Sequence, residues 1–244
     1  MAIILVGCQK SQENQESQTA SDEITSEEET VTDQNKEVEA EEPMTTQDKE
    51  LFFQAVENGN ISKITSFIKD GADINSVNQE GRTAAMIATY NNDSETVKLL
   101  IENGADVNIQ DNMKNNPFLY AGAEGYLEIV KLTAEAKADP KLLNRFGGTA
   151  LIPASEHGYV EVVKELLENT EIDVNHVNDL GWTAMLEAVV LGNGGKNQQE
   201  TIELLIKHGA DVNIPDSNGV TPLQHAKELG FTEIRDILLD AGAE

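Results

Sequence analysis

From residue 51 onwards, apolar and polar residues follow the period of amphipathic helices, in short stretches separated by turn-forming residues. The clearest stretches place apolar side chains three and four positions apart, and they are Val97, Leu100 and Ile101, then Val163, Leu166 and Leu167, then Ile202, Leu205 and Ile206. Gly104 and Gly209 follow two of these stretches. Because Gly readily adopts the left-handed conformation, these two glycines are predicted to end their helices.

A second, shorter helical pattern of the form Thr-Ala-x-x-x-Ala, or a close relative, precedes each of these stretches. Pro117 and Pro222 stand at the first helical position of two copies, where a missing N–H costs nothing. The residues predicted to cap these helices by accepting a backbone N–H are Thr83, Asn116, Thr149, Thr183 and Thr221. Each unit is therefore predicted to be a helix–turn–helix.

The units repeat along the chain. The motif Gly-Ala-Asp-Val-Asn at 104–108 is matched at 71–75 and 209–213, with weaker copies between them. Aligned on these motifs, the units begin near residues 45, 78, 111, 144, 178 and 216, which gives spacings of 33, 33, 33, 34 and 38 residues. A repeat of this length with these motifs resembles the ankyrin repeat.

This resemblance implies an all-α ankyrin-repeat solenoid, in which six helix–turn–helix units are joined by β-hairpin loops and stabilised by stacking. It also implies a protein-binding module, a monomer that holds its partner on the concave face and the hairpin tips. The residues predicted to contact that partner are Arg82, Tyr90, Met113, Arg145, Phe146, His157, Leu180 and Trp182. Of these, Met113, Phe146, Leu180 and Trp182 are expected to align as an apolar stripe suited to an interface. The alternative is that Phe146 and Trp182 only pack against neighbouring hairpins.

Two units depart from the ankyrin pattern. In the third unit Lys114 stands where a hairpin glycine is expected, and Lys137 and Lys141 replace the later glycine and asparagine. We therefore expect Asn115 or Asn116 to form that turn, or the turn to have a different shape. The fifth unit carries extra residues within 192–199, expected to form a loop between its helices that is either tolerated decoration or a contact with the partner.

The N-terminal part has a different composition. Residues 9–47 contain twelve acidic and two basic residues and few apolar ones, so they are predicted to form a disordered acidic tether before a repeat domain at 48–244. Within residues 1–8, Leu5-Val6-Gly7-Cys8 resembles the lipobox of bacterial lipoprotein signal peptides. That resemblance implies a lipid anchor at Cys8 and a place on the outer side of a bacterial membrane. No basic residue precedes Cys8, and the apolar part is shorter than the roughly 7–15 residues usual in secretory signals.

Composition narrows the function classes. With 17 Lys+Arg against 44 Asp+Glu and a net charge of −27, the chain is not expected to bind nucleic acid. The single cysteine excludes an intrachain disulfide, and no apolar run approaches the roughly 20 residues of a membrane-spanning helix. The four histidines, at 157, 176, 208 and 225, form no catalytic or metal-binding motif, so no enzyme activity, cofactor or metal is predicted. The alternatives are an intracellular ankyrin-repeat inhibitor or scaffold with a disordered tail, and a hydrolase using acidic residues of its groove.

Overall fold

The computed structural model describes residues 45–244. The predicted lipobox at 1–8, and the tether at 9–47 up to residue 44, lie outside the described residues. The described part of the chain contains twelve α-helices and no β-strand. The helices are α1 (Thr46–Glu57), α2 (Ile61–Lys69), α3 (Ala84–Tyr90), α4 (Ser94–Glu102), α5 (Pro117–Glu124), α6 (Leu127–Glu135), α7 (Leu151–Glu156), α8 (Val160–Asn169), α9 (Ala184–Val190), α10 (Lys196–Lys207), α11 (Pro222–Leu229) and α12 (Thr232–Asp240).

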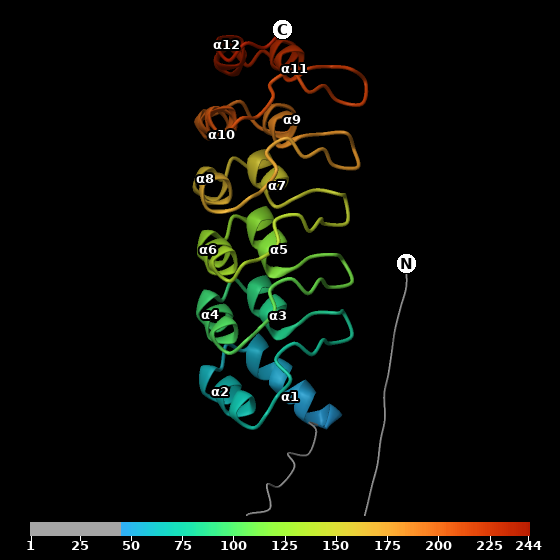
Figure 1. The fold of residues 1–244 in the computed structure, drawn as a ribbon, viewed down its shortest axis with the longest axis vertical. Helices are drawn as coiled ribbons and strands as arrows, with labels where there is room; N and C mark the ends of the chain where they lie inside the picture. The colour runs from blue at the N-terminus through green and yellow to red at the C-terminus, as the bar shows by residue number, and fades with distance from the viewer. Residues whose placement is uncertain (1–44) are drawn as a thin grey trace, which may run out of the picture. The chain divides into compact units, whose positions relative to one another are not determined.

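The helices form six antiparallel pairs stacked in one direction. The first helices of the units form one column, the second helices form another, and the connecting loops project to the side away from the second helices (Figure 1). Each helix packs against its partner in the same unit, and most also pack against the equivalent helices of neighbouring units, as α7 does with α5, α8 and α9. The predicted all-α solenoid of six units is confirmed.

The core is shared between units. Large side chains that are completely or almost completely buried, such as Phe52, Phe118, Leu151 and Met185, come from first helices, and others such as Leu205 come from second helices. Because these side chains pack against neighbouring units, no unit could bury its apolar face alone.

Hairpin-shaped tips open units two to six. Each tip begins with an Asn or Asp whose side-chain oxygen accepts hydrogen bonds from the backbone N–H groups two and four residues later. These residues are Asn78, Asp111, Asn144, Asn178 and Asp216. Such side-chain-to-backbone bonds define a tight turn without a strand.

The tip of unit three has the same turn as the others, and the prediction that Asn115 or Asn116 would form this turn is wrong. Lys114 itself adopts a φ of +58°, and its N–H bonds to Asp111 O at 2.9 Å, as that of Gly81 does to Asn78 O at 3.0 Å. A left-handed lysine costs about 1–3 kcal/mol. It is held there by the bonds that Asp111 makes and by the neighbouring tip, since Asn112 N–H donates to Glu80 O at 3.0 Å.

Four of the five predicted caps are confirmed; Thr149 is not a cap. Helix α7 begins at Leu151, and the buried Thr149 hydroxyl has no hydrogen-bond partner among the described residues. In the other units the fourth residue after the cap donates its N–H to the carbonyl of the cap, as Glu187 does to Thr183 at 3.0 Å. Pro153 occupies that position in unit four and has no N–H, so the first turn of α7 cannot form in the same way.

The extra residues of unit five are only partly a loop. Residues 191–195 connect α9 to α10, and the rest of the predicted 192–199 loop belongs to the longer helix α10. Buried Gln198 donates from Nε2 to Glu156 O at 3.4 Å, so the insertion packs back on unit four.

At the other end of the array, Thr45 and Asp48 form a capping box for α1. Helical structure therefore begins at residue 46, inside the segment 9–47 that the composition assigns to the tether.

Candidate protein-binding groove

A hollow of about 720 Å³ runs along the tips and first helices of units two to five. We call this hollow the groove. Among its lining residues are six of the eight predicted contact residues, namely Arg82, Tyr90, Met113, Arg145, Phe146 and Leu180. His157 and Trp182 do not line it.

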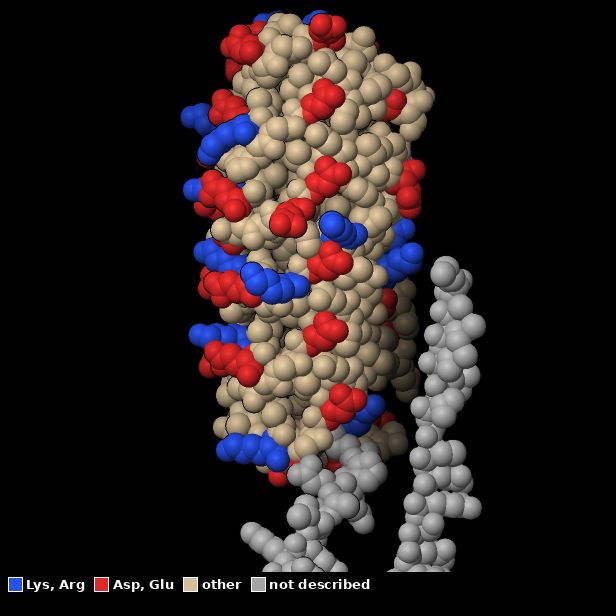
Figure 2. All heavy atoms as spheres, viewed as in Figure 1, with Lys and Arg blue, Asp and Glu red and all other residues tan. Residues whose placement is uncertain are grey.

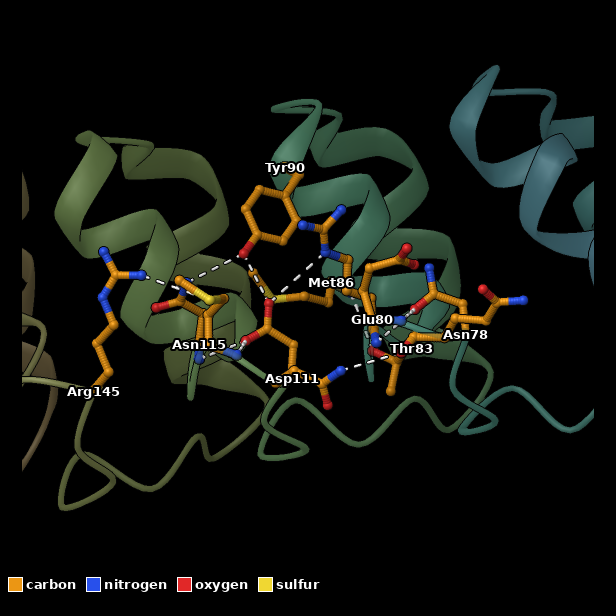
Figure 3. A network of polar contacts seen from close by, with 12 residues as sticks. Asn78, Glu80, Thr83, Met86, Tyr90, Asp111, Asn115 and Arg145 are labelled. Carbon is orange, nitrogen blue, oxygen red and sulfur yellow. Dashed lines mark hydrogen bonds and ion pairs between the residues drawn. The ribbon is translucent and has the colours of Figure 1, made fainter.

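Arg82 and Tyr90 are held in place by a polar network at one end of the groove. The Tyr90 hydroxyl donates to Asp111 Oδ2 at 2.8 Å and accepts from Asn115 Nδ2 at 3.2 Å (Figure 3). The Arg82 guanidinium lies 4.2 Å from the centroid of the Tyr90 ring, and its Nε is 3.9 Å from Asp111 Oδ2. Burial, together with the nearby Asp111 carboxylate, raises the pKa of Tyr90. Asp111 thus both shapes its tip and orients two groove residues.

Three tips contribute apolar side chains to the groove. Phe146 is 52% exposed, Leu180 is 61% exposed and Met113 is also exposed. The Arg145 guanidinium lies 4.7 Å from the Phe146 ring centroid and donates from Nη1 to Met113 Sδ at 3.6 Å. The expected stripe therefore extends over Met113, Phe146 and Leu180. Trp182 stands at the base of its tip, where its N–H and C=O both bond to Asn178, and its side chain is partly buried outside the groove.

His157 lies on the surface of unit four, beside the unit-five insertion. Its Nδ1 is 3.8 Å from Glu156 Oε2, and its ring is 5.3 Å from that of Tyr159. It shares a shallow hollow with Asn193 and Gln198 rather than the groove.

Several residues that line the groove are not among the predicted contact residues, and Tyr120 and Glu187 are two of them. The Tyr120 ring lies 4.3 Å from that of Tyr90, and burial followed by the charge of Glu124 raises its pKa to about 12. Tyr120 and Glu187 both stand four positions after a helix cap; Tyr120 is partly buried and Glu187 is buried. The sequence signal for Glu187 is an acidic residue at a repeat position that is occupied by Ile87 in unit two.

Glu187 is a buried carboxylic acid, only 6% exposed, on α9. Its Oε1 accepts from Asn178 Nδ2 at 2.9 Å. Burial, and to a lesser extent the charge of Glu156, raises its pKa to about 7. Glu124 and Glu156 also line the groove, and within residues 45–244 no Lys or Arg nitrogen lies within 4.0 Å of any of these three carboxylates.

Two further observations on the described residues concern metal sites and membrane-spanning helices. Residues 45–244 contain no cluster of three or more His, Cys, Asp or Glu side chains arranged to hold a metal ion. None of their helices combines the length and the apolar character that crossing a bilayer requires.

A stack of helix–turn–helix units with a groove along its tips and first helices defines a repeat protein with a binding surface rather than a closed pocket. The chain matches the family described as ankyrin repeats (3 copies) over residues 52–144 and 118–216. It belongs to the ankyrin-repeat family.

Known proteins resemble parts of the chain. It is 52% identical over 79 residues to the putative ankyrin repeat protein YahD of Escherichia coli K12, a match that covers 32% of this chain and 39% of YahD. It is 34% identical over 74 residues to mouse protein phosphatase 1 regulatory subunit 27, covering 30% of this chain and 45% of that protein. The chain thus spans less than half the length of these curated relatives.

A solved structure matches more of the chain. The crystal structure of an ankyrin repeat domain from Acinetobacter baumannii AYE shares 48% sequence identity and a TM-score of 0.79. The match covers 81% of this chain and all of that one.

Proposed function

We propose that this chain is a non-enzymatic protein-interaction module that holds a partner protein in the groove. The observation that carries the proposal is the exposure of Met113, Phe146 and Leu180 on adjoining tips, beside two arginines already fixed in position. Exposed aromatic, methionine and arginine side chains around a hollow are typical of interface centres. Membership in the ankyrin-repeat family, whose proteins are typically interaction modules without catalytic activity, supports it.

Binding of the partner is expected to weaken when the apolar side chains of two tips are shortened to Ala. Full-length protein immobilised on beads captures partners from the source cells, and the Phe146→Ala/Leu180→Ala double variant is expected to retain them at least about tenfold less well, as for interface centres. The matched control is Leu229→Ala/Leu239→Ala, which removes two exposed apolar side chains, 46% and 45% exposed, that do not line the groove. Equal capture by the two double variants would contradict the proposal.

We further propose that the module is held on the outer side of a bacterial membrane by lipid at Cys8. The resemblance of Leu5-Val6-Gly7-Cys8 to a lipobox and the acidic segment that follows it support this proposal. A lipidated cysteine carrying a second acyl chain would anchor the protein stably.

Labelled palmitate tests this proposal in a bacterial host. The wild-type chain is expected to incorporate the label and to partition with membranes, whereas Cys8→Ala does neither. Absence of label from the wild type would favour the alternative, an intracellular inhibitor or scaffold. The match to a protein named as a phosphatase regulatory subunit is the observation in favour of that alternative.

A further inference from the structure

We propose that the groove receives a partner segment that inserts one basic side chain, Arg or Lys, between Glu156 and Glu187 and lays apolar residues against Phe146 and Leu180. This inference rests on the proposed function of the groove and adds the chemistry of the partner.

The geometry comes from two neighbouring units, each of which supplies one acid and one apolar tip residue. Unit four places Phe146 on its tip and Glu156 at the end of α7, and unit five places Leu180 on its tip and Glu187 in α9. Helices α7 and α9 pack directly against each other, and all four side chains line the same hollow. A basic side chain directed inward and flanked by apolar residues matches this arrangement of inner acids and outer apolar groups.

In the described part of the chain neither acid has a Lys or Arg partner, and the basic group nearest to Glu156 is the His157 ring, whose Nδ1 lies 3.8 Å from Glu156 Oε2. Arg82 is stacked on Tyr90 and faces Asp111, while Arg145 is stacked on Phe146. Asn178 is the side chain that donates a hydrogen bond to Glu187. A buried carboxylate without a cation is unfavourable, and one beside a second carboxylate more so. An inserted guanidinium or ammonium group would supply the missing charge with directed hydrogen bonds.

The electrostatic field of the acidic chain also favours a basic partner segment. The chain carries a net charge of −27, of which −17 belongs to residues 45–244, with 15 Lys+Arg against 32 Asp+Glu. On the face seen in Figure 2, acidic side chains recur along the length of the array, both in the middle of the face and among the Lys and Arg side chains at the edge of the second helices. Such a field attracts basic segments and repels acidic ones.

Binding is expected to depend on pH through Glu187. The groups that face Glu187 are Glu156 on α7 and Asn178 on the tip of unit five. On the neighbouring helix α11, His225 contacts Asp216 instead, with Nε2 3.0 Å from Asp216 Oδ2. The buried side chains of α10 are uncharged. Burial and Glu156 raise the pKa of Glu187 to about 7, so in the free protein much of it is protonated below that pH. A bound cation favours the carboxylate, so binding releases a proton and strengthens as the pH rises from about 6 to 8.

Peptide display on the full-length protein tests the inference without knowledge of the natural partner. Random 12-residue peptides are selected at pH 8 on the wild type and on Phe146→Ala/Leu180→Ala, and the peptides that depend on these two side chains are kept. We expect them to contain one Arg or Lys between apolar residues. A synthetic peptide of this kind should bind Glu187→Gln about tenfold or more weakly than the wild type, the value of a charged hydrogen bond.

The control is Glu161→Gln, the same change at an exposed position of α8, which should bind the peptide like the wild type. Circular dichroism verifies that Glu187→Gln folds, and the variant should lose the rise in affinity between pH 6 and 8. Groove-dependent peptides that are acidic or lack a basic residue, or equal binding by Glu187→Gln, would overturn the inference and leave the proposed function standing. A selection that yields no groove-dependent peptide would count against both.

Discussion

Replacing Phe118 with Ala is expected to lower the free energy of unfolding by about 3–5 kcal/mol. Phe118 is only 1% exposed, in the first turn of α5 at the middle of the array. Removing its ring leaves a cavity between units. Because repeat arrays depend on contacts between neighbours, the loss weakens both sides of unit three. Urea unfolding followed by circular dichroism measures the effect.

The matched control is Phe146→Ala, the same substitution at a side chain that is 52% exposed. It is expected to change the free energy of unfolding by no more than about 0.5 kcal/mol, as surface substitutions usually do. Similar losses for the two variants would mean that the placement of Phe118 in the core, or of Phe146 on the surface, is wrong.

Replacing Gly122 with Leu is expected to destabilise the protein by about 3 kcal/mol, the upper range for overpacking. A Cβ atom at this position would lie 2.8 Å from Ala150 Cβ and 3.1 Å from Ala150 O, so units three and four would have to separate. The usual gain of about 1 kcal/mol for replacing a helical glycine with Ala is therefore not expected at residue 122 either. Thermal and urea unfolding give the magnitude.

Lys98→Leu is the control for this substitution. Lys98 is exposed on α4, where an added Leu meets solvent and not a neighbouring unit. Its expected effect is within about 0.5 kcal/mol. A Gly122→Leu variant as stable as Lys98→Leu would show that the two units are not in close contact.

The fold could be predicted from the sequence because its signals are local and repeated. Helix caps such as Thr83 and turn glycines such as Gly104 act within a few residues, and other units repeat one or both of these features. The errors arise where a neighbouring group overrides the local rule. Pro153 removes the bond that a Thr149 cap needs, and the adjoining tip holds Lys114 in a conformation that lysine alone disfavours.

The groove could be predicted only in part. Met113, Phe146 and Leu180 could be predicted as groove residues, because the register of the repeats fixes which residues lie at the tips. Glu187 could not be predicted, because the sequence shows an acidic residue on a helix but does not show that Asn178 and the packing of α7 enclose it. The role of these residues in binding remains a prediction.

The asparagines of the Gly-Ala-Asp-x-Asn motif also link the units. Asn75 Oδ1 accepts from Asp106 N–H at 2.8 Å, and Asn108 and Asn175 make the equivalent bonds to the following units. Lys141 stands at this position in unit three, so no such bond joins units three and four. There the array relies on helix packing and on the tips.

The tips are themselves tied to one another in sequence. Glu80 O accepts from Asn112 N–H at 3.0 Å, Phe146 O accepts from Asp179 N–H at 3.0 Å, and Leu180 O accepts from Ser217 Oγ at 3.0 Å. Hydrogen bonds therefore hold these tips in a fixed arrangement along the edge that a partner would contact, so the tips are not independent loops. If the proposed partner docks there, the tips themselves would lose little conformational entropy on binding.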